Sequence, residues 1–563
     1  MSMTAKKYKG FELAWNTSAM KIKMYSYIAL ICFLIFLLCF IILCTIFIGI
    51  KGTWLIFSYA MWSVVHAIIP IPASLFISEA SKFGVSTIQS YVHSQLLLLL
   101  GLSAISAVSF RFAWPRFMAK IKKTAEEEAQ ERHVRGTEIT SEEILGTLIK
   151  DKYPTNIRIT ENVSLPIESE KEHAFITGRT RTGKTVTFKN VIRQLKQNGG
   201  GKGIIYEFKS EDNSDNPDLI TGDYTQEFYD KERDFIFNPF LKQCVGWNVF
   251  NEIRDIHDCT LVAESMIPRP ETPAGSEAYF LDISRDVFTG ILASLWARGD
   301  RDHRALINAL TSSQDDIRDM LGETDLGKMF LNHLTEGAQG QTAGALSELN
   351  RFAKVFLHLR DTNGDFSFRK WVREGEGWIF IANRARFAQD LKPLLSLVLD
   401  LMCTEVLSMR DLRHDDTSRT YLFLDELPTL QKLPSLIRLL TLAGGKGWSV
   451  WLGAQDFGAM KSTYGQHIAG SIFNNTGTKL VLKVEDPDTA AFLSKALGDR
   501  EIVRTNESSS AGLGENRDGE SYSKQHDVNK AILESQIMNL ETLHAFLKVK
   551  NFPVAKILIP FKI

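Results

Sequence analysis

The chain has 563 residues, a length that predicts several domains rather than one. Its 65 lysines and arginines nearly balance 66 acidic residues, which excludes a globally basic surface, so any nucleic-acid contact must use a local surface or an assembled pore. The six cysteines include no Cys-x-x-Cys pair, which argues against a zinc site or a disulfide framework and fits a reducing compartment for the soluble part.

The first 121 residues are predicted to form a membrane anchor. Residues 24–50 carry no charged side chain and are long enough to span a bilayer with some tilt. A signal peptide is the alternative, but the apolar core is too long and no small-x-small cleavage site follows it. A second apolar run, residues 94–113, is predicted to span as well. Residues 53–78 contain a histidine and two prolines, and are either a third span or a loop along the membrane.

The distribution of basic residues predicts the topology of this anchor. Lysines precede the first apolar run, and arginines and lysines follow the last one, whereas the segment between them carries only Lys51 and Lys82. The positive-inside rule therefore places both flanks in the cytoplasm, which requires an even number of spans. Two spans are the simplest solution.

A polar, helical stalk begins near residue 122 and leads into the first part of a nucleotide-binding domain, residues 122–251. The stretch "GRTRTGKT" fits the phosphate-loop pattern G-x-x-x-x-G-K-[ST], and it lies between a β-favouring run and an amphipathic helical pattern. Backbone N–H groups would hold the phosphates of ATP, Lys184 would reach the β- and γ-phosphates, and Thr185 would bind Mg²⁺. The predicted nucleotide-binding residues are Gly178, Arg179, Thr180, Arg181, Thr182, Gly183, Lys184 and Thr185.

Two arginines in this loop are unusual, because such loops commonly carry small residues there. One interpretation is that Arg179 and Arg181 point outward and meet solvent or a neighbouring acid. The other is that one of them supplies positive charge to the phosphates.

A carboxylate pair follows a second buried run. Residues 421–424 are apolar, as in a strand buried within a parallel sheet, and end at Asp425 and Glu426. Asp425 is predicted to hold the water shell of Mg²⁺, and Glu426 to orient or deprotonate the attacking water; a helix N-cap is the structural alternative. The next run ends at Gln455, which would sense the γ-phosphate or position water. This order predicts an ATPase with an added strand between the phosphate-loop strand and the carboxylate strand, the RecA-like layout.

Several longer stretches resemble one family, the type IV secretion coupling proteins, or TraD/TraG-like ATPases of conjugation. The most specific are "LDELPTLQKLPSLIRLL" and "GAQD", supported by "YEFKSE", "FNPF" and "WNVFNEI". The resemblance implies an α/β RecA-like P-loop ATPase core behind a two-helix transmembrane anchor, with an inserted all-α domain at residues 252–356 and a return to the core at 357–563. It also implies a multi-pass protein of the bacterial inner membrane, with the ATPase domain in the cytoplasm.

The same resemblance implies partners. Coupling proteins form homo-hexameric rings, receive single-stranded DNA with covalently bound relaxase, and pass it to secretion channel components. Two alternatives remain: a receptor for protein effectors on the same scaffold, and an FtsK/HerA-like DNA translocase. The last residue is Ile563, and we expect substrate docking to use the core, the α domain or adaptors rather than a long C-terminal tail.

The chain departs from the family at the arginine that reaches a neighbour's nucleotide. Gly444 and Gly445 stand where that arginine is expected, and Lys446 is the only basic residue of the segment. The other candidates are Arg438, Arg384 and Arg386. Residues 504–527, rich in Ser, Gly and charge, are predicted to be a mobile surface loop.

Overall fold

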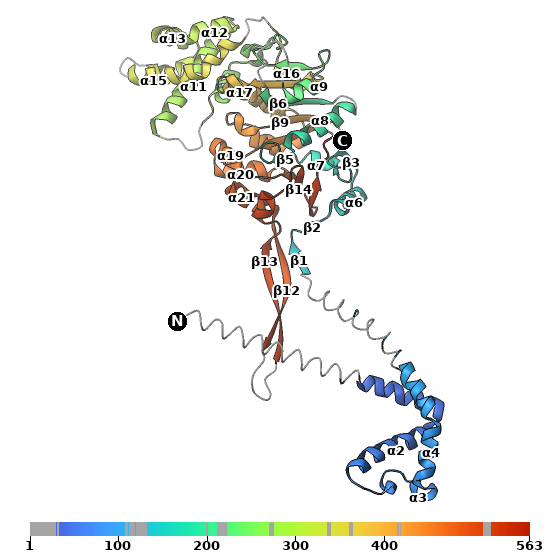
Figure 1. Ribbon diagram of the computed structural model, residues 1–563. Coiled ribbons are helices and arrows are strands. Elements are labelled where there is room, and N and C mark those ends of the chain that lie inside the picture. The colour runs from blue at the N-terminus through green and yellow to red at the C-terminus, as the bar shows by residue number, and fades with distance from the viewer. Residues whose placement is uncertain are drawn as a thin grey trace, which may run out of the picture. The chain divides into compact units, whose positions relative to one another are not determined.

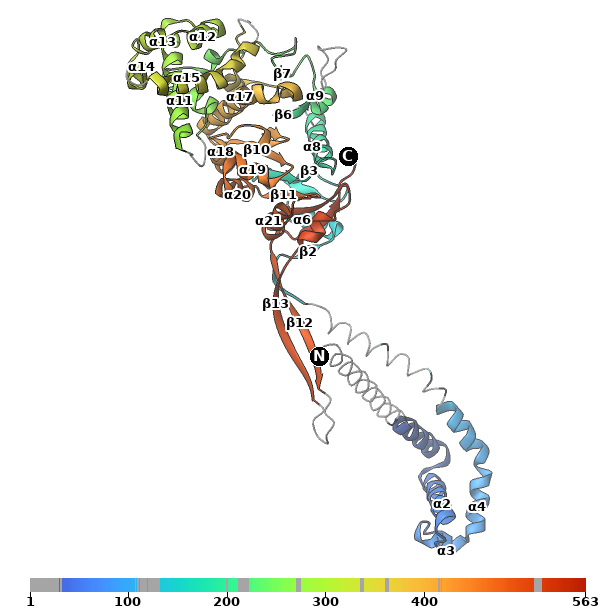
Figure 2. The same ribbon diagram turned by 60° about the vertical axis from the view of Figure 1, so that its left-hand side comes forward.

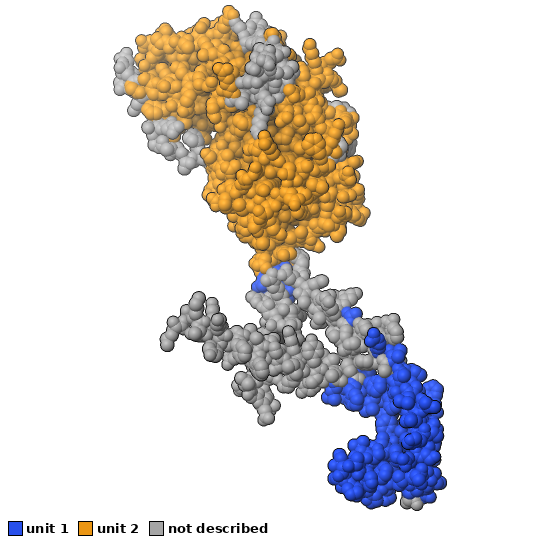
Figure 3. Space-filling view, viewed as in Figure 1, with its two compact units in different colours: residues 1–134, 501–527 blue, residues 135–500, 528–563 orange. Residues whose placement is uncertain are grey.

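The computed structural model describes residues 33–106, 132–198, 201–210, 222–269, 275–334, 339–359, 364–413, 416, 418–510 and 519–562, together with the single residues 30, 108, 111 and 119. The chain divides into two compact units, coloured separately in Figure 3: residues 1–134 with 501–527, and residues 135–500 with 528–563.

The larger unit is built on a ten-stranded sheet with the order β2-β15-β14-β11-β5-β10-β9-β6-β8-β7 (Figure 1). The seven strands from β11 to β7 run parallel, while β14 is antiparallel to both of its neighbours. In sheet order the strands are β2 (Ile139–Thr140), β15 (Val554–Leu558), β14 (His544–Val549), β11 (Thr478–Val481), β5 (Ala174–Thr177), β10 (Trp448–Ala454), β9 (Thr420–Leu424), β6 (Lys202–Ser210), β8 (Trp378–Arg384) and β7 (Phe235–Phe237). A separate pair is formed by β3 (Thr155–Arg158) and β4 (Ser164–Pro166).

Strand β10 lies between β5, which leads into the phosphate loop, and β9, which ends just before Asp425. Its register pairs Ala454 with Thr177 on one side and Leu452 with Leu424 on the other. The predicted added strand is confirmed, and the carboxyl ends of β5, β9 and β10 meet at one edge of the sheet.

The central strands are buried on both faces, which explains why they read as continuous apolar runs. On β9, Phe423 packs with Phe188 of α8 on one face, while Leu422 and Leu424 belong to the core cluster on the other face, with α17. Helices therefore cover both sides of the sheet, as in other doubly wound folds. They include α6 (Glu142–Lys152), α7 (Ile167–Glu170), α8 (Lys184–Gln197), α9 (Asp223–Phe228), α17 (Ala388–Ser408), α18 (Leu436–Leu442), α19 (Phe457–Tyr464), α20 (Gln466–Asn474), α21 (Pro487–Leu497) and α22 (Glu534–Met538), with short 3₁₀ turns η6 (Ala385–Phe387), η7 (Leu427–Thr429) and η8 (Ala443–Lys446).

Between β7 and β8 the regular elements of the described residues are all helical. Figure 1 and Figure 2 both show α11, α12, α13 and α15 grouped together, while α17 lies against the sheet. The elements are η2 (Val249–Glu252), α10 (Asp258–Met266), α11 (Gly275–Arg298), α12 (His303–Leu310), α13 (Gln314–Leu321), α14 (Asp325–Lys328), η3 (Leu331–Leu334), α15 (Gln339–Ala353), η5 (Lys354–His358) and α16 (Phe368–Glu374). The helical character expected of an inserted domain is present, and the domain limits 252 and 356 stay predictions.

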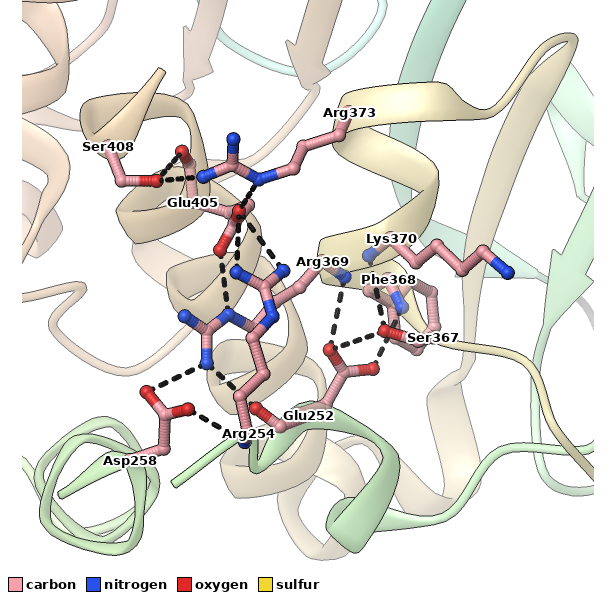
Figure 4. A network of polar contacts seen from close by, with 10 residues as sticks. All are labelled: Glu252, Arg254, Asp258, Ser367, Phe368, Arg369, Lys370, Arg373, Glu405 and Ser408. Carbon is pink, nitrogen blue, oxygen red and sulfur yellow. Dashed lines mark hydrogen bonds and ion pairs between the residues drawn. The ribbon is translucent and has the colours of Figure 1, made fainter. Parts of the chain in front are cut away.

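A buried charge network ties the start of this helical region to α16 and α17 (Figure 4). Glu405 of α17 has a fully buried side chain and accepts hydrogen bonds from Arg369 Nε at 2.8 Å and from Arg254 Nη1 at 3.1 Å, and it also pairs with Arg373. Arg369 makes a second ion pair with Asp258 of α10 at 2.9 Å. Because the charges are paired and hydrogen-bonded, the network fixes the geometry of this junction, although its net stabilisation is small.

The smaller unit contains the helices of the N-terminal region. They are Phe33–Ile48, α2 (Ile50–Ile68), η1 (Ala73–Leu75), α3 (Ala80–Phe83), α4 (Val85–Ser94) and Leu96–Ser106. Within the described residues no single helix is both long and apolar enough to cross a membrane, although α4 and Leu96–Ser106, bent by 50°, pass that test as a pair. Both predicted spans extend into residues outside the described ranges, so the two-span anchor stays a prediction.

The prediction of a mobile loop at residues 504–527 is wrong for most of that stretch. β12 (Asp499–Ser510) and β13 (Gly519–Lys530) form a three-stranded sheet with β1 (Arg132–Gly136). The polar composition gives no sign of these strands in the sequence. Strands are recognised in a sequence by alternating apolar residues, and pairing of the backbone does not require that alternation.

Candidate nucleotide site

The phosphate loop joins β5 to α8, which begins at Lys184. Gly183 has φ of +126°, a conformation that side chains disfavour. A Cβ atom on Gly178 would lie 2.5 Å from the Leu482 side chain, so this position also requires glycine. Inside the loop the Thr182 hydroxyl donates a hydrogen bond to the Arg179 carbonyl at 2.7 Å. Gly183 thus allows the backbone conformation of the loop, and Gly178 allows the loop to pack closely against Leu482.

Lys184 and the carboxylate pair are in contact. The Lys184 ammonium donates to the Asp425 carbonyl at 2.8 Å and forms an ion pair with Glu426 Oε2. Asp425 Oδ1 is 3.8 Å from the same nitrogen. All three residues are buried, with exposed fractions below 9%. Charges this far from water interact strongly, so Glu426 holds Lys184 in place at the end of β9.

Gln455 completes this cluster. Its backbone N–H donates to Glu426 Oε1 at 3.0 Å, and its side-chain oxygen accepts a hydrogen bond from the Thr180 hydroxyl at 2.9 Å. The end of β10 is thereby linked both to the carboxylate pair and to the phosphate loop.

The residues expected to hold Mg²⁺ fit that ion. Asp425 Oδ1 is buried and accepts no hydrogen bond from the residues that the structure describes, so it is an oxygen with a free lone pair. Thr185 is the second residue of α8 and lines the same cavity. The described residues contain no group of three or more His, Cys, Asp or Glu side chains suited to a metal. One carboxylate and one hydroxyl suit Mg²⁺ that arrives with nucleotide phosphates and keeps several waters.

Tyr224 is a residue of this site that sequence reasoning missed. Its side chain is buried, and its hydroxyl has no hydrogen-bond partner within the described residues. Burial raises the pKa of this phenol well above its usual value, with a further contribution from the Asp425 carboxylate, and the Thr185 hydroxyl also faces it. A buried hydroxyl therefore lies beside both predicted Mg²⁺ ligands.

Glu207, in the stretch "YEFKSE", positions Tyr224. Its buried carboxylate accepts hydrogen bonds from the backbone N–H of Tyr224 at 2.9 Å and from the Thr225 hydroxyl at 2.9 Å. Burial raises the pKa of Glu207 to about 7. A Cβ on Gly222 would lie 2.1 Å from this carboxylate, so the approach of α9 to β6 depends on that glycine. No pattern in the sequence predicts this contact.

The cavity around the loop has a volume of about 220 Å³. Its lining includes three residues that sequence reasoning also missed, Thr542, Leu543 and Phe561. The Leu543 N–H donates to the Thr182 carbonyl at 2.9 Å, which fixes the C-terminal strands against the phosphate loop. The other lining residues are Arg179, Thr180, Arg181, Gly183, Lys184, Thr185, Val186, Phe208, Asp425, Glu426 and Gln455.

The two arginines of the loop differ. Arg179 forms an ion pair with Glu485, and its N–H donates to the Lys483 carbonyl at 2.9 Å. Arg181 is exposed, lines the cavity with φ of +66°, and has no ion-pair partner within the described part of the chain. Arg179 thus meets a neighbouring acid, as one interpretation expected, whereas Arg181 is free to approach a phosphate.

The segment that lacks the expected arginine is closely packed. A Cβ on Gly444 would lie 2.2 Å from the Lys171 carbonyl oxygen, so no side chain fits there. Lys446 donates to the Met409 carbonyl at 2.6 Å and pairs with Asp411 at 3.1 Å within its own chain. Arg438 and Arg386 are exposed, and the side chain of Arg384 lies outside the described residues.

Comparison with known proteins gives a consistent result. A family model described as "Type IV secretion-system coupling protein DNA-binding domain" matches residues 157–560. The coupling protein TraD of Escherichia coli (strain K12) is 25% identical over 427 residues, which is 74% of this chain and 56% of TraD. The chain spans about half the length of the curated relatives it matches.

Solved structures of the conjugative coupling protein TrwB are similar as well, each at 26% identity over 77% of this chain. The unbound form has a TM-score of 0.66 and 94% of its chain covered. The complex with ADP and Mg²⁺ has a TM-score of 0.65, and the complex with the ATP analogue ADPNP has 0.64, each with 95% covered.

Proposed function

Because the chain belongs to the type IV secretion-system coupling protein DNA-binding domain family, we propose that it is an ATP hydrolase that drives DNA transfer. In this proposal it recruits relaxase-bound single-stranded DNA to a type IV secretion channel and moves that DNA during conjugation. The related TrwB complexes with ADP and Mg²⁺ and with an ATP analogue support ATP and Mg²⁺ as the ligands of the loop site.

The observation that carries the proposal is the convergence of Lys184, Asp425 and Glu426 in one cavity inside the family-matched residues. A phosphate loop alone is found in many protein classes. A carboxylate pair at the end of the strand beyond β10, linked to Gln455, is the arrangement that an ATPase needs to orient water near a γ-phosphate.

The proposed mechanism depends on the contacts within the protein that a bound nucleotide would replace. The γ-phosphate competes with Glu426 for the Lys184 ammonium, so its arrival frees the carboxylate to accept a hydrogen bond from the attacking water. Asp425 and Thr185 would hold Mg²⁺, which when bound neutralises charge on the β- and γ-phosphates. Gln455, held by Thr180, would orient the same water or contact the γ-phosphate.

The anchor and the assembly belong to the same proposal. Residues 24–50 and 94–113 would cross the bacterial inner membrane and leave the ATPase domain in the cytoplasm. Exposed apolar side chains along the N-terminal helices, such as Leu38, Ile46 and Leu97, are consistent with a lipid environment. A homo-hexamer would let an arginine of one copy, Arg438 or Arg386, reach the nucleotide of the next.

The test is ATP hydrolysis by the full chain in lipid nanodiscs, with and without oligo(dT), at several salt concentrations. We expect Lys184→Ala to abolish hydrolysis. We also expect oligo(dT) to stimulate the wild-type rate, and this stimulation to fall as salt rises, because phosphate contacts release counterions. If Lys184 is required but oligo(dT) leaves the rate unchanged, DNA transport is contradicted and a protein-effector receptor is favoured.

A further inference from the structure

Phe561 is an exposed aromatic residue that lines the nucleotide cavity. Its exposed fraction is 79%, yet it borders the same cavity as Lys184 and Glu426. A single exposed phenylalanine is common on protein surfaces and is not by itself a binding site. What distinguishes Phe561 is that the backbone around it is fastened to the phosphate loop and to the helix that follows that loop.

The first attachment is made by α8. The Asn190 side chain donates a hydrogen bond from Nδ2 to the Pro560 carbonyl at 2.8 Å. Asn190 is buried, and its Oδ1 accepts a hydrogen bond from Arg193 Nη1 at 2.8 Å, so the amide is fixed in the orientation that presents Nδ2 to Pro560. The residue directly before Phe561 is therefore tied to α8.

The second attachment is made to the phosphate loop itself. The Ile559 N–H donates to the Leu543 carbonyl at 2.8 Å, and the Leu543 N–H donates to the Thr182 carbonyl at 2.9 Å. Leu543 has φ of +64°, a conformation that residues with a side chain rarely adopt and that the surrounding structure must impose. The loop between α22 and β14 thus joins the phosphate loop to the segment that carries Phe561.

These attachments place Phe561 beside the first turns of α8. Asn190 lies one helical turn after Val186, so the two side chains are on the same face of α8. Val186, Leu543 and Phe561 all line the cavity. The cavity therefore has an apolar portion formed by these three residues, besides the charged portion at the end of β9.

We propose that Phe561 is the stacking platform for the base of the bound nucleotide. ATP needs both portions of the cavity, because its triphosphate is charged and the two faces of its adenine ring are apolar. An aromatic ring left in water loses exposed apolar area when a nucleobase stacks on it, and two rings of this kind favour an offset, stacked arrangement. The inference rests on the proposed function, since it takes the phosphates of ATP to lie in the phosphate loop.

A contact with the base has a kinetic signature. The base is remote from the γ-phosphate, so stacking stabilises the ground state and the transition state of hydrolysis equally. Loss of such a contact raises KM and leaves kcat unchanged. We therefore expect Phe561→Ala to raise KM for ATP in steady-state hydrolysis while kcat stays as in wild type.

The direct test compares Phe561→Ala and Phe561→Leu with a control, Leu558→Ala. Leucine keeps an apolar side chain but has no aromatic face, and Leu558 is an exposed residue of β15 that is not among the cavity-lining residues. All variants are full chains in nanodiscs. Calorimetry in the presence of Mg²⁺ measures the Kd of ADP and the Kd of inorganic tripolyphosphate, which has phosphates but no base.

We expect Phe561→Ala to weaken ADP binding about tenfold and Phe561→Leu at least about threefold, because removal of an aromatic platform from a nucleobase has an effect of this order. Both variants should bind tripolyphosphate as wild type does, and Leu558→Ala should match wild type with both probes. The substituted side chain is exposed, so the variants should keep the wild-type melting temperature.

Three results would overturn the stacking platform. The first is an unchanged Kd for ADP in Phe561→Ala. The second is an equal loss of affinity for ADP and for tripolyphosphate, which would show that Phe561 supports the phosphate loop and does not bind the base. The third is wild-type ADP affinity in Phe561→Leu, which would show that any apolar side chain suffices.

The same measurements separate this inference from the proposed function. A wild-type protein that hydrolyses ATP, together with a Phe561→Ala variant of unchanged ADP affinity, overturns the platform and leaves the proposed function intact. A wild-type protein that binds ADP but hydrolyses no ATP contradicts the proposed function. A loss of ADP affinity in Phe561→Ala without loss of tripolyphosphate affinity would in that case still support the platform.

Discussion

The Lys184 ammonium and the Glu426 carboxylate form a buried ion pair, although 242 positions separate them in the sequence. The pair joins the helix that follows the phosphate loop to the residue proposed to activate water. Each group therefore occupies the position proposed for the other's functional partner, which is the γ-phosphate for Lys184 and the attacking water for Glu426.

Glu426→Gln should uncouple binding from hydrolysis. We expect the turnover rate to fall by about 10²-fold or more, because a positioned general base contributes about that much. Nucleotide affinity should be retained or increased, since the amide competes less strongly for Lys184. Single-turnover hydrolysis and the Kd of a fluorescent ATP analogue, measured on the same preparation, give the two quantities. Near-normal turnover would remove Glu426 from the catalytic role.

Tyr224→Phe removes one hydroxyl beside Asp425 and Thr185. We expect the Mg²⁺ concentration that half-saturates ADP binding to rise about tenfold, because this unpaired hydroxyl is available to donate to the Asp425 carboxylate when Asp425 holds Mg²⁺, and a hydrogen bond to a charged group is worth about 1.5 kcal/mol. Binding of ADP without Mg²⁺ should be unchanged, and calorimetric titration of ADP at fixed Mg²⁺ concentrations measures both.

The control for this change is Tyr229→Phe, at a partly buried tyrosine just after α9. It removes the same hydroxyl away from the carboxylate pair and should leave the Mg²⁺ dependence as in wild type. Equal Mg²⁺ curves for Tyr224→Phe and wild type would show that the phenol does not act on the metal site.

Arg181 and Arg179 should behave differently. Arg181→Ala is expected to lower kcat/KM for ATP about tenfold, since an exposed guanidinium at the cavity is available to the phosphates. Arg179→Ala should change it less than twofold, because that side chain is engaged by Glu485 at the surface. Steady-state hydrolysis at fixed protein concentration compares the two. If Arg181→Ala is as active as Arg179→Ala, Arg181 does not contact nucleotide.

The sequence predicts those residues of the site that belong to a local sequence pattern. The phosphate loop requires a strand, a glycine turn and a helix in succession, and Asp425, Glu426 and Gln455 each follow an apolar run. The carboxyl ends of parallel strands meet at one edge, so their convergence could be predicted without coordinates.

The residues that were missed depend on contacts distant in sequence. Leu543 and Phe561 reach the cavity because β14 pairs with β11, far along the chain from the phosphate loop. Tyr224 is placed by the buried Glu207 carboxylate, and a single glutamate near a strand end carries no signal of that role. The strands of 499–530 were hidden because their composition is that of a loop.

His173 is a buried residue beside β5 whose titration makes the stability of the protein depend on pH. Its Nδ1 accepts a hydrogen bond from the Val450 N–H at 3.1 Å, and burial lowers its pKa from 6.5 to about 4. The unfolded chain therefore binds the proton more readily than the folded chain between those values. The stability that this residue contributes is present above pH 6.5 and is lost as the pH falls from 6.5 towards 4, by up to about 3 kcal/mol.

The variant His173→Asn should lose less stability than wild type as the pH falls. Asparagine places an oxygen where Nδ1 accepts the hydrogen bond, tolerates the observed φ of +62°, and does not titrate. The buried Glu207, with its pKa raised to about 7, has the opposite effect, because its stability contribution falls as the pH rises from 4.5 to 7. The readout is therefore the difference in melting temperature between wild type and variant, measured from pH 7.5 to pH 4.5. The control is His467→Asn at an exposed site, which should follow wild type. A difference between His173→Asn and wild type that does not change with pH would contradict the assignment of the lowered pKa to this histidine.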